Sequence, residues 1–320
     1  MYMPTRRGFI AAGTLMALTR PLRAAAKPVT LIVPYAAGGP NDNFARLLAE
    51  GMGARTGRPF IVENKPGANG IIGASQVARA APDGSTLLMG GSGPISLNIL
   101  LRPGLQYGFE SFDSVAMLFD GPLTISVPPQ LGVSSLPDLV AYARRQGRAL
   151  TYGSLGPGSV TDLYGLILSK ALDIPLTAVP YKSTPTSLID LIMGRNDLSF
   201  MTPIALADHQ KAGAVKILTL TTDRRDPALP DVPCVTELGY PQLKASYWTA
   251  LHAPRGTPAA LIHAYAEAAV NTVQTASFRQ MLLTNGQTEK AGGPSALQAQ
   301  LQADRQYWGK VIKDNHIVLD

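Results

Sequence analysis

The stretch VTLIVPYAAGGPND, residues 29–42, contains the pattern that decides the fold. Its first five residues are almost all apolar and β-branched, which is typical of a short buried strand. Gly38 and Gly39 then turn the chain, and an apolar series at helical spacing follows: Phe44, Leu47, Leu48 and Met52. A strand, a glycine-rich turn and an amphipathic helix make one βα unit, which predicts a mostly parallel sheet covered by helices.

The same order recurs twice along the chain. Strand patterns at residues 59–65 and 85–91 complete a first series, and those at 149–154, 176–181, 197–202 and 215–221 form a second. Extended stretches around Phe119–Ser126 and Tyr247–His252 connect the two series, and everything after Thr257 is predicted to be helical. We therefore expect a bilobal α/β fold, with residues 27–122 and 248–320 in lobe I and residues 123–247 in lobe II.

Residues 1–26 have the features of a removable export signal. Arg6 and Arg7 precede a short apolar run, and Ala24-Ala25-Ala26 offers a cleavage site before Lys27. The paired arginines favour the twin-arginine route, although a general-secretion signal would also end in the periplasm. No segment approaches the roughly 20 apolar residues of a membrane-spanning helix, so the mature chain is expected in the periplasm without membrane insertion.

Charge and cysteine content narrow the function further. Four arginines and no acidic residue precede Lys27, so the formal charge of +6 falls to 6 − 4 = +2 for the mature chain. Without a dense basic run, nucleic-acid binding is not expected. Cys234 is the only cysteine, which excludes an intramolecular disulfide and a cysteine-based metal site.

Three strand-to-helix loops are rich in Gly, Ser, Thr and Asn: residues 36–42, 90–94 and 153–159. In open α/β sheets, ligands bind at the carboxyl ends of the strands. A helix start offers unpaired backbone N–H groups that attract a carboxylate or phosphate without any arginine. The alternative is that the loops only turn the chain, since Ser159 and Asp162 also form a capping box.

Catalytic and cofactor motifs do not appear. The serines in these loops lack G-x-S-x-G spacing, and the four histidines form neither H-x-x-x-H nor H-E-x-x-H. Neither a dinucleotide fingerprint nor a P-loop follows any strand. We therefore expect no cofactor, no metal and no enzymatic activity.

The chain resembles the Bug-type extracytoplasmic receptors, the substrate-binding proteins of tripartite tricarboxylate transporters. The resemblance covers nearly all of the predicted mature chain and rests on the order and spacing of several segments: VPYAAGGPND, VENKPGANGIIGA, APDGSTLLMGGSG, LTYGSLGPGS, VPYKS, DLIMGRNDLSF, APRGTP and WGKVIKDNHI. It implies a periplasmic-binding-protein fold of the second topological type, which closes on an organic carboxylate, and membrane permease subunits as partners.

The resemblance also implies a mode of recognition, in which backbone amides, hydroxyls and ordered water hold the ligand carboxylate. The candidate ligand-binding residues come from the three loops and from the ends of two later strands: Tyr35, Gly38, Gly39, Asn41, Asp42, Ser92, Ser154, Gly158, Ser159, Lys182, Met201 and Thr202.

Three positions depart from the family pattern. Asp162 stands where histidine is common, Ser183 replaces the glycine of a Tyr-Lys-Gly motif, and Met201-Thr202 replaces Asp-Asn. The missing carboxylate at the last position favours a ligand with a neutral or apolar body at that end. A receptor that reports to a membrane sensor kinase would have the same fold and cleft, so the sequence leaves transport and signalling both open.

Overall fold

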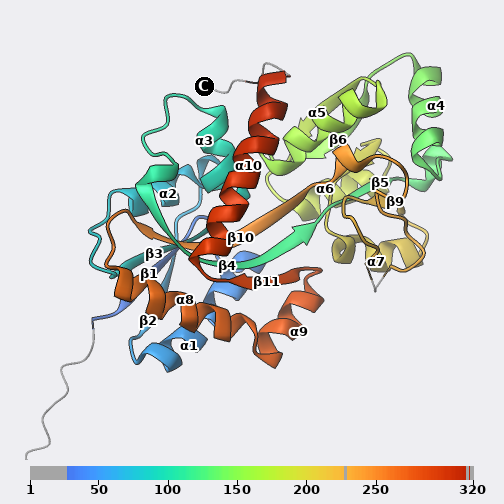
Figure 1. Ribbon diagram of the computed structural model, residues 1–320. Coiled ribbons are helices and arrows are strands. Elements are labelled where there is room, and N and C mark those ends of the chain that lie inside the picture. The colour runs from blue at the N-terminus through green and yellow to red at the C-terminus, as the bar shows by residue number, and fades with distance from the viewer. Residues whose placement is uncertain (1–26, 227–228, 315–316, 318–320) are drawn as a thin grey trace, which may run out of the picture.

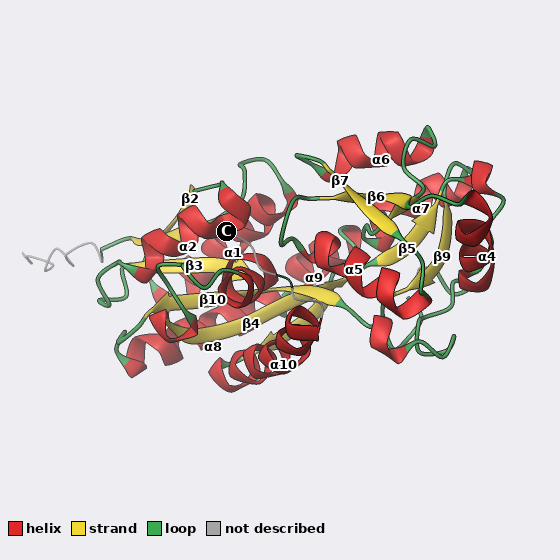
Figure 2. Ribbon diagram, turned by 90° about the horizontal axis from the view of Figure 1, so that it is seen from above, coloured by secondary structure: helices red, strands yellow, loops and turns green. Residues whose placement is uncertain are grey.

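The structure, a computed structural model, describes residues 27–226, 229–314 and 317, so the predicted export signal lies outside the described residues. The described chain forms two halves, each built around one β-sheet with helices on its faces (Figures 1 and 2). Within the described residues, no helix is both long enough and apolar enough to cross a membrane.

The larger sheet has six strands in the order β11-β4-β10-β3-β1-β2. β1 pairs in parallel with β2 and β3, whereas β10 runs antiparallel to β3 and β4, and β11 runs antiparallel to β4. The strands are β1 (Val29–Val33), β2 (Phe60–Asn64), β3 (Thr86–Gly91), β4 (Phe112–Pro122), β10 (Ser246–Pro254) and β11 (Thr288–Gly292).

Helices cover the larger sheet because their apolar stripes need a partner surface. Phe44 of α1 packs 4.6 Å from Phe119 of β4 and 5.8 Å from Phe278 of α9, measured between ring centroids. The helices are α1 (Pro40–Thr56), α2 (Ile71–Ala78), α3 (Asn98–Leu101), α8 (Ala259–Val273), α9 (Ala276–Thr284) and α10 (Pro294–Asp314), with short turns η1 (Ala68–Gly70), η2 (Ser92–Leu97, π-helical) and η3 (Phe109–Ser111).

The smaller sheet has five strands in the order β7-β6-β8-β5-β9. β6 is parallel to β7 and β8, and β5 is antiparallel to β8 and β9. Its elements are β5 (Thr124–Val127), β6 (Leu150–Ser154), β7 (Leu176–Pro180), β8 (Leu198–Ser199) and β9 (Lys216–Leu220), with α4 (Leu136–Gln146), α5 (Val160–Leu172), α6 (Thr184–Ile192), α7 (Pro203–Lys211), η4 (Pro129–Leu131) and η5 (Pro241–Leu243).

Two strand connections carry the chain between the sheets. Leu123 alone separates β4 from β5, and Ala245 precedes β10 on the return. The buried hydroxyl of Thr221 accepts from the Leu123 N–H at 2.9 Å and lies 2.6 Å from the Ala245 carbonyl oxygen, to which it can donate. One side chain therefore ties both crossings to the edge of the smaller sheet.

Helix α10 packs against both halves. Its first part contributes Leu297 to the apolar cluster beneath α2 and β3, whereas Trp308 and Ile312 belong to the cluster that contains Leu150 and Leu198 of the smaller sheet. Figure 1 shows this helix, in red, lying in front of β4 and β10 and reaching toward α5. A single helix thus spans the two sheets on one face of the molecule.

The sequence-based elements need two corrections. Residues 288–292 form strand β11, although everything after Thr257 was expected to be helical, and helix α7 lies between the two last strand patterns of the second series. Strand β11 is an edge strand, held by its register with β4, which local sequence does not encode.

Candidate functional site

The first loop, between β1 and α1, brings together the predicted residues Tyr35, Gly38, Gly39 and Asn41. Gly38 adopts φ +77°, a conformation that favours glycine. The N-cap residue of α1 is Gly39, which has no side chain to accept a hydrogen bond, and Pro40 occupies the first turn. In the described structure, no protein acceptor meets the backbone N–H groups of Gly39, Asn41 and Asp42, so this helix start retains donors for an anion.

Asp42 closes this loop on itself. Its Oδ2 accepts the Gly38 N–H at 2.9 Å and the Arg46 Nε–H at 3.0 Å, while its buried Oδ1 has no hydrogen-bond partner among the described residues. The Gly38 amide, followed by Arg46, lowers the pKa of this carboxyl, and burial only partly opposes them. Asp42 is therefore an anion that is paired with Arg46.

The second loop, between β6 and α5, contains Ser154, Gly158 and Ser159. Ser159 caps α5, because its Oγ accepts the Asp162 N–H at 3.2 Å, but the reciprocal bond of a capping box is absent, since the Ser159 N–H donates to the Gly156 carbonyl. In return, Asp162 Oδ2 accepts the Gly158 N–H at 2.9 Å, and the Ser154 hydroxyl donates to Asp162 Oδ1 at 3.3 Å. The Gly158 amide, one of the predicted anion donors, is thus already used by Asp162.

The second loop meets lobe I through Asn69 of η1, a residue that the loop patterns in the sequence did not indicate. Its Nδ2 donates to the Gly158 carbonyl oxygen at 3.3 Å, and its own carbonyl accepts from the Asn98 side chain at 3.0 Å. Asn69 has φ +51°, which asparagine tolerates better than most residues, so an asparagine within the run Gly-Ala-Asn-Gly at residues 67–70 was the available signal. This bond joins lobe II to the glycine-rich segment of lobe I.

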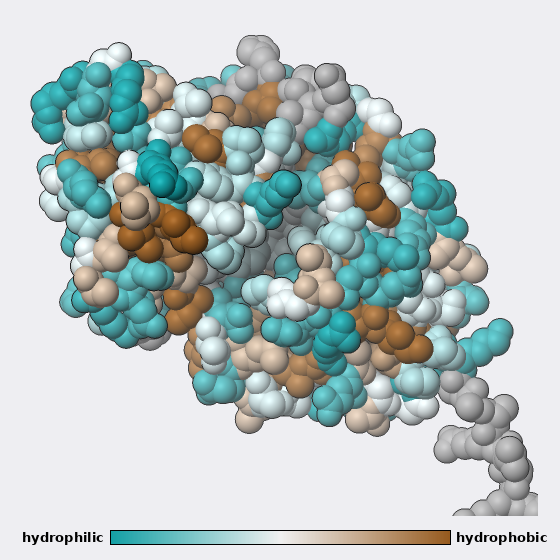
Figure 3. All heavy atoms as spheres, turned by 180° about the vertical axis from the view of Figure 1, so that it is seen from behind, coloured by the Kyte–Doolittle hydropathy of each residue, from teal (hydrophilic) through white to brown (hydrophobic). Residues whose placement is uncertain are grey.

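Close backbone contacts place the remaining lobe I segments beside Asn69. A Cβ on Gly70 would lie 3.3 Å from Pro34 Cβ and 2.9 Å from Pro94 Cβ, and one on Gly93 would lie 3.2 Å from Asn69 Oδ1. The ends of β1 and β3 therefore converge on the segment that contacts Gly158. Viewed from behind, the molecular surface is hollowed between the two halves (Figure 3).

The predicted Ser92 is buried at the start of η2. Its hydroxyl oxygen accepts the Trp248 N–H at 2.8 Å, so Ser92 holds the crossing strand β10 against β3. Trp248 in turn donates its indole N–H to Asp304 of α10 at 2.8 Å. Ser92 can still donate its hydroxyl proton.

The later candidates occupy different environments. Lys182 is exposed after β7, and Thr202 is the N-cap residue of α7, without a side-chain cap bond. Met201 is 5% exposed and packs in an apolar cluster with Leu206 and Ile217. Its side chain is therefore part of the core, and the hypothesis of a ligand contact at this point is better supported for Thr202.

A second group of polar side chains lies where the crossings meet lobe I. Burial, reinforced by the neighbouring Tyr247, raises the pKa of Tyr35 to about 12, and burial likewise raises that of Tyr247 to about 12. Gln287 donates through Nε2 to the Tyr247 hydroxyl, and a Cβ on Gly121 would lie 2.5 Å from that hydroxyl. Both tyrosines thus remain neutral hydrogen-bonding groups at ordinary pH.

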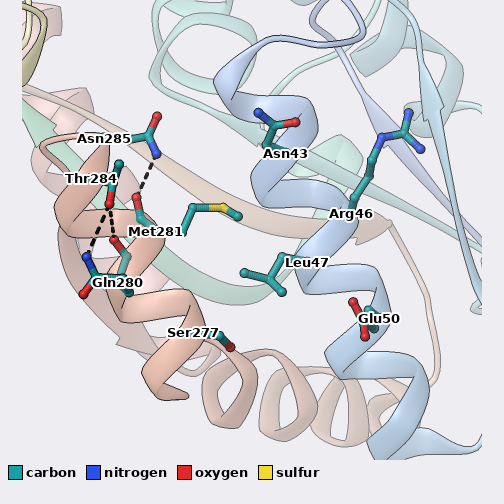
Figure 4. A pocket seen from close by; sticks show the side chains of 9 residues that line it. All are labelled: Asn43, Arg46, Leu47, Glu50, Ser277, Gln280, Met281, Thr284 and Asn285. Atoms are coloured by element: carbon teal, nitrogen blue, oxygen red, sulfur yellow. Dashed lines mark hydrogen bonds between the residues drawn. The ribbon is translucent and has the colours of Figure 1, made fainter.

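A groove of about 610 Å³ lies elsewhere, between α1 and α9. Leu47 and Met281 point toward each other across it (Figure 4). It contains none of the predicted site residues, and no group of His, Cys, Asp and Glu able to hold a metal occurs in the described part of the chain.

Two α/β sheets joined by two crossings, with polar loops at the carboxyl ends of their strands, define the class of periplasmic binding proteins. Residues 44–317 match the family model described as tripartite tricarboxylate transporter family receptor, and the chain belongs to this family.

Three solved structures show the likeness in detail. MatC (Rpa3494) from Rhodopseudomonas palustris with bound malate is 31% identical, with a TM-score of 0.78 over 89% of this chain and 98% of that one. R. palustris Rpa4515 with adipate is 32% identical, with a TM-score of 0.81 over 91% and 98%. The periplasmic binding protein BugD is 31% identical, with a TM-score of 0.79 over 91% and 98%.

Proposed function

We propose that this protein is a periplasmic receptor that captures a small organic carboxylate between its two lobes and delivers it to the membrane permease subunits of a tripartite tricarboxylate-type transporter. Membership of the receptor family supports this role, as do the malate and adipate in two related structures. The proposal of binding without catalysis rests on the family, which is a receptor family.

The observation that carries the proposal is the hydrogen bond from Asn69 to Gly158, because it joins a loop of one half to the site loop of the other. A ligand between these loops touches both halves, so it stabilises the arrangement in which they approach. We propose that lobe I consists of residues 27–122 and 248–320, that lobe II consists of residues 123–247, and that they move about Leu123 and Ala245.

The ligand carboxylate is proposed to lie at the start of α1. The N–H groups of Gly39, Asn41 and Asp42 supply donors there, and the α1 dipole adds positive potential. Tyr35 and Ser92 contribute hydroxyls on the lobe I side, and Ser154 and Ser159 contribute hydroxyls from lobe II toward the rest of the ligand. Lys182 at the rim attracts anions from solution through its charge.

A ligand screen tests the proposal with protein purified from periplasmic extracts of cells that express the full sequence. Thermal shifts are measured against mono- and dicarboxylates, and each acid is matched with its amide. A binding acid at one hundred times its Kd adds about 2.7 kcal/mol to the stability. We expect at least one acid to raise Tm while its amide does not; a screen in which only neutral or cationic solutes stabilise the protein would refute the proposal.

Delivery requires a separate test. Labelled ligand is offered to cells that contain the permease subunits, with and without the receptor gene. We expect uptake only with the receptor, and unchanged uptake in its absence would show that it has another output.

A further inference from the structure

The site loops of the two lobes are closed in the same way. In each loop, a glycine with φ near +76° donates its N–H to an aspartate in the first turn of the following helix: Gly38 to Asp42 and Gly158 to Asp162, both at 2.9 Å. Each lobe therefore presents a carboxylate beneath its ligand loop.

The two carboxylates differ in their charge partners. Four residues after Asp42, one helical turn away, Arg46 pairs with it at 3.0 Å. The equivalent position after Asp162 is Leu166, an apolar side chain that is 37% exposed. Among the described residues, no ion pair joins Asp162 to a basic side chain. The lobe II loop thus has an acidic group that is hydrogen-bonded but has no ion-pair partner among the described residues, whereas the carboxylate of the lobe I loop is ion-paired.

The backbone donors of the loops differ in the same direction. In the lobe II loop, Leu155 donates its N–H to Thr161 Oγ1, Gly156 to Ser154 Oγ and Ser159 to the Gly156 carbonyl. In the described structure, the N–H groups of Val160 and Thr161 at the start of α5 remain without protein acceptors, whereas the lobe I loop leaves three such groups, those of Gly39, Asn41 and Asp42. Lobe I therefore offers an anion more free backbone donors than lobe II does, while lobe II presents hydroxyls and a carboxylate that accept hydrogen bonds.

We infer that Asp162 is a specificity-determining residue that disfavours a second ligand carboxylate at lobe II, and that the natural ligand is a hydroxy-monocarboxylate. Its carboxylate binds the start of α1, and its hydroxyl donates to the Ser154–Asp162 group. This inference rests on the proposed function and narrows its ligand class. Like charges in a partly desolvated site repel, whereas a hydroxyl donor gains a charge-assisted hydrogen bond.

Matched ligand pairs test the inference by calorimetric titration of the purified protein. Each dicarboxylate is compared with the hydroxy acid of the same carbon number: succinate with 4-hydroxybutyrate, glutarate with 5-hydroxypentanoate, and adipate with 6-hydroxyhexanoate. The wild-type protein is expected to bind the hydroxy acid of the best-fitting pair more tightly. Asp162→Asn should shift the affinity ratio toward the dicarboxylate by about tenfold.

Two further variants separate charge from structure. Leu166→Arg leaves Asp162 in place and adds the cation that Arg46 supplies in lobe I, so it should shift the ratio in the same direction. Asp173→Asn removes an equal charge from the exposed C-cap of the same helix, about 16 Å away, and should leave the ratio unchanged. In Asp162→Asn, the side-chain amide oxygen can still accept the Gly158 N–H, so the loop conformation is preserved.

The outcomes are distinct. If the wild-type protein binds every dicarboxylate more tightly than its hydroxy acid, or if neither Asp162→Asn nor Leu166→Arg moves the ratio, the inference fails while the receptor function stands. If no acid binds to any variant, the proposed function fails as well.

Discussion

The buried His252 should make the protein less stable in mild acid. His252 lies in β10, is 1% exposed, and has an Nε2 atom without a partner in the described structure. The rings of Phe112 and Trp248 lie 6.0 and 6.2 Å away, centroid to centroid. Burial lowers the pKa of His252 to about 3, although a hydrogen bond with the Gly90 backbone acts in the opposite direction.

The free energy of unfolding depends on pH because His252 binds a proton more readily in the unfolded chain than in the folded protein. The folded protein keeps His252 neutral down to about pH 3, whereas the unfolded chain protonates it below about pH 6.5. Between these values the unfolded state binds more protons, so the free energy of unfolding falls as the pH falls. Each pH unit costs about 1.4 kcal/mol, which amounts to about 2 kcal/mol between pH 8 and pH 5.

Urea denaturation at pH 8 and pH 5 measures this loss for the wild type and three variants. His252→Gln has no titrating group at this position, so its unfolding free energy should fall by about 2 kcal/mol less than that of the wild type. His263→Gln, on the exposed face of α8, should behave like the wild type. His252→Leu provides a second test should glutamine pack poorly.

Equal losses in the wild type and both His252 variants would refute the reasoning. They would mean that water reaches the imidazole or that an unrecognised acceptor stabilises its charged form. The other titrating groups are the same in the wild type and the two His252 variants, so they cancel in this comparison.

Three further substitutions test the connections between the lobes. Thr221→Val keeps the shape but leaves buried backbone groups of Leu123 and Ala245 without their partner, and should lower the unfolding free energy by about 1–3 kcal/mol in urea denaturation. Asn69→Gly keeps the positive φ but removes the bond to Gly158, so titration should show about fivefold weaker ligand binding with little change in Tm. Trp308→Ala should cost about 3–5 kcal/mol, and hydrogen exchange should show faster opening of α5. An unchanged unfolding free energy in Thr221→Val or Trp308→Ala would contradict the connecting role of that side chain. An unchanged ligand affinity in Asn69→Gly would contradict the role of its bond to Gly158.

Local patterns were sufficient for most of the fold. The strands at Val29–Val33 and Leu150–Ser154 are buried and largely apolar or β-branched, and the α5 stripe is strongly apolar, so their periodicity survives any tertiary context. Residues 288–292, TEKAG, have no such pattern, because an edge strand is specified by the neighbour that it pairs with.

The site was only partly predictable for a related reason. Loop composition made Gly38, Ser154 and Ser159 candidates, which stay a prediction, and of the expected capping box only the N-cap bond from Asp162 N–H to Ser159 Oγ is present. The partner of the Gly158 carbonyl is Asn69, 89 residues away, and no local pattern reveals such a contact. The Gly158 N–H donates to Asp162 and is therefore not free for a ligand. This bond depends on the direction of the Asp162 side chain, which sequence spacing alone does not determine.

The position of α10 has a consequence for the order of biosynthesis. Trp308 and Ile312 complete the apolar cluster around Leu150 and Leu198, although these pairs are more than 100 residues apart in sequence. A ribosome that has finished residue 247 has therefore produced every strand of the smaller sheet but not all of its core. The half around the smaller sheet must wait for residues 294–314 before it reaches its final packing. Its strands all lie between Thr124 and Leu220, but its core depends on a helix made after the last strand of the larger sheet.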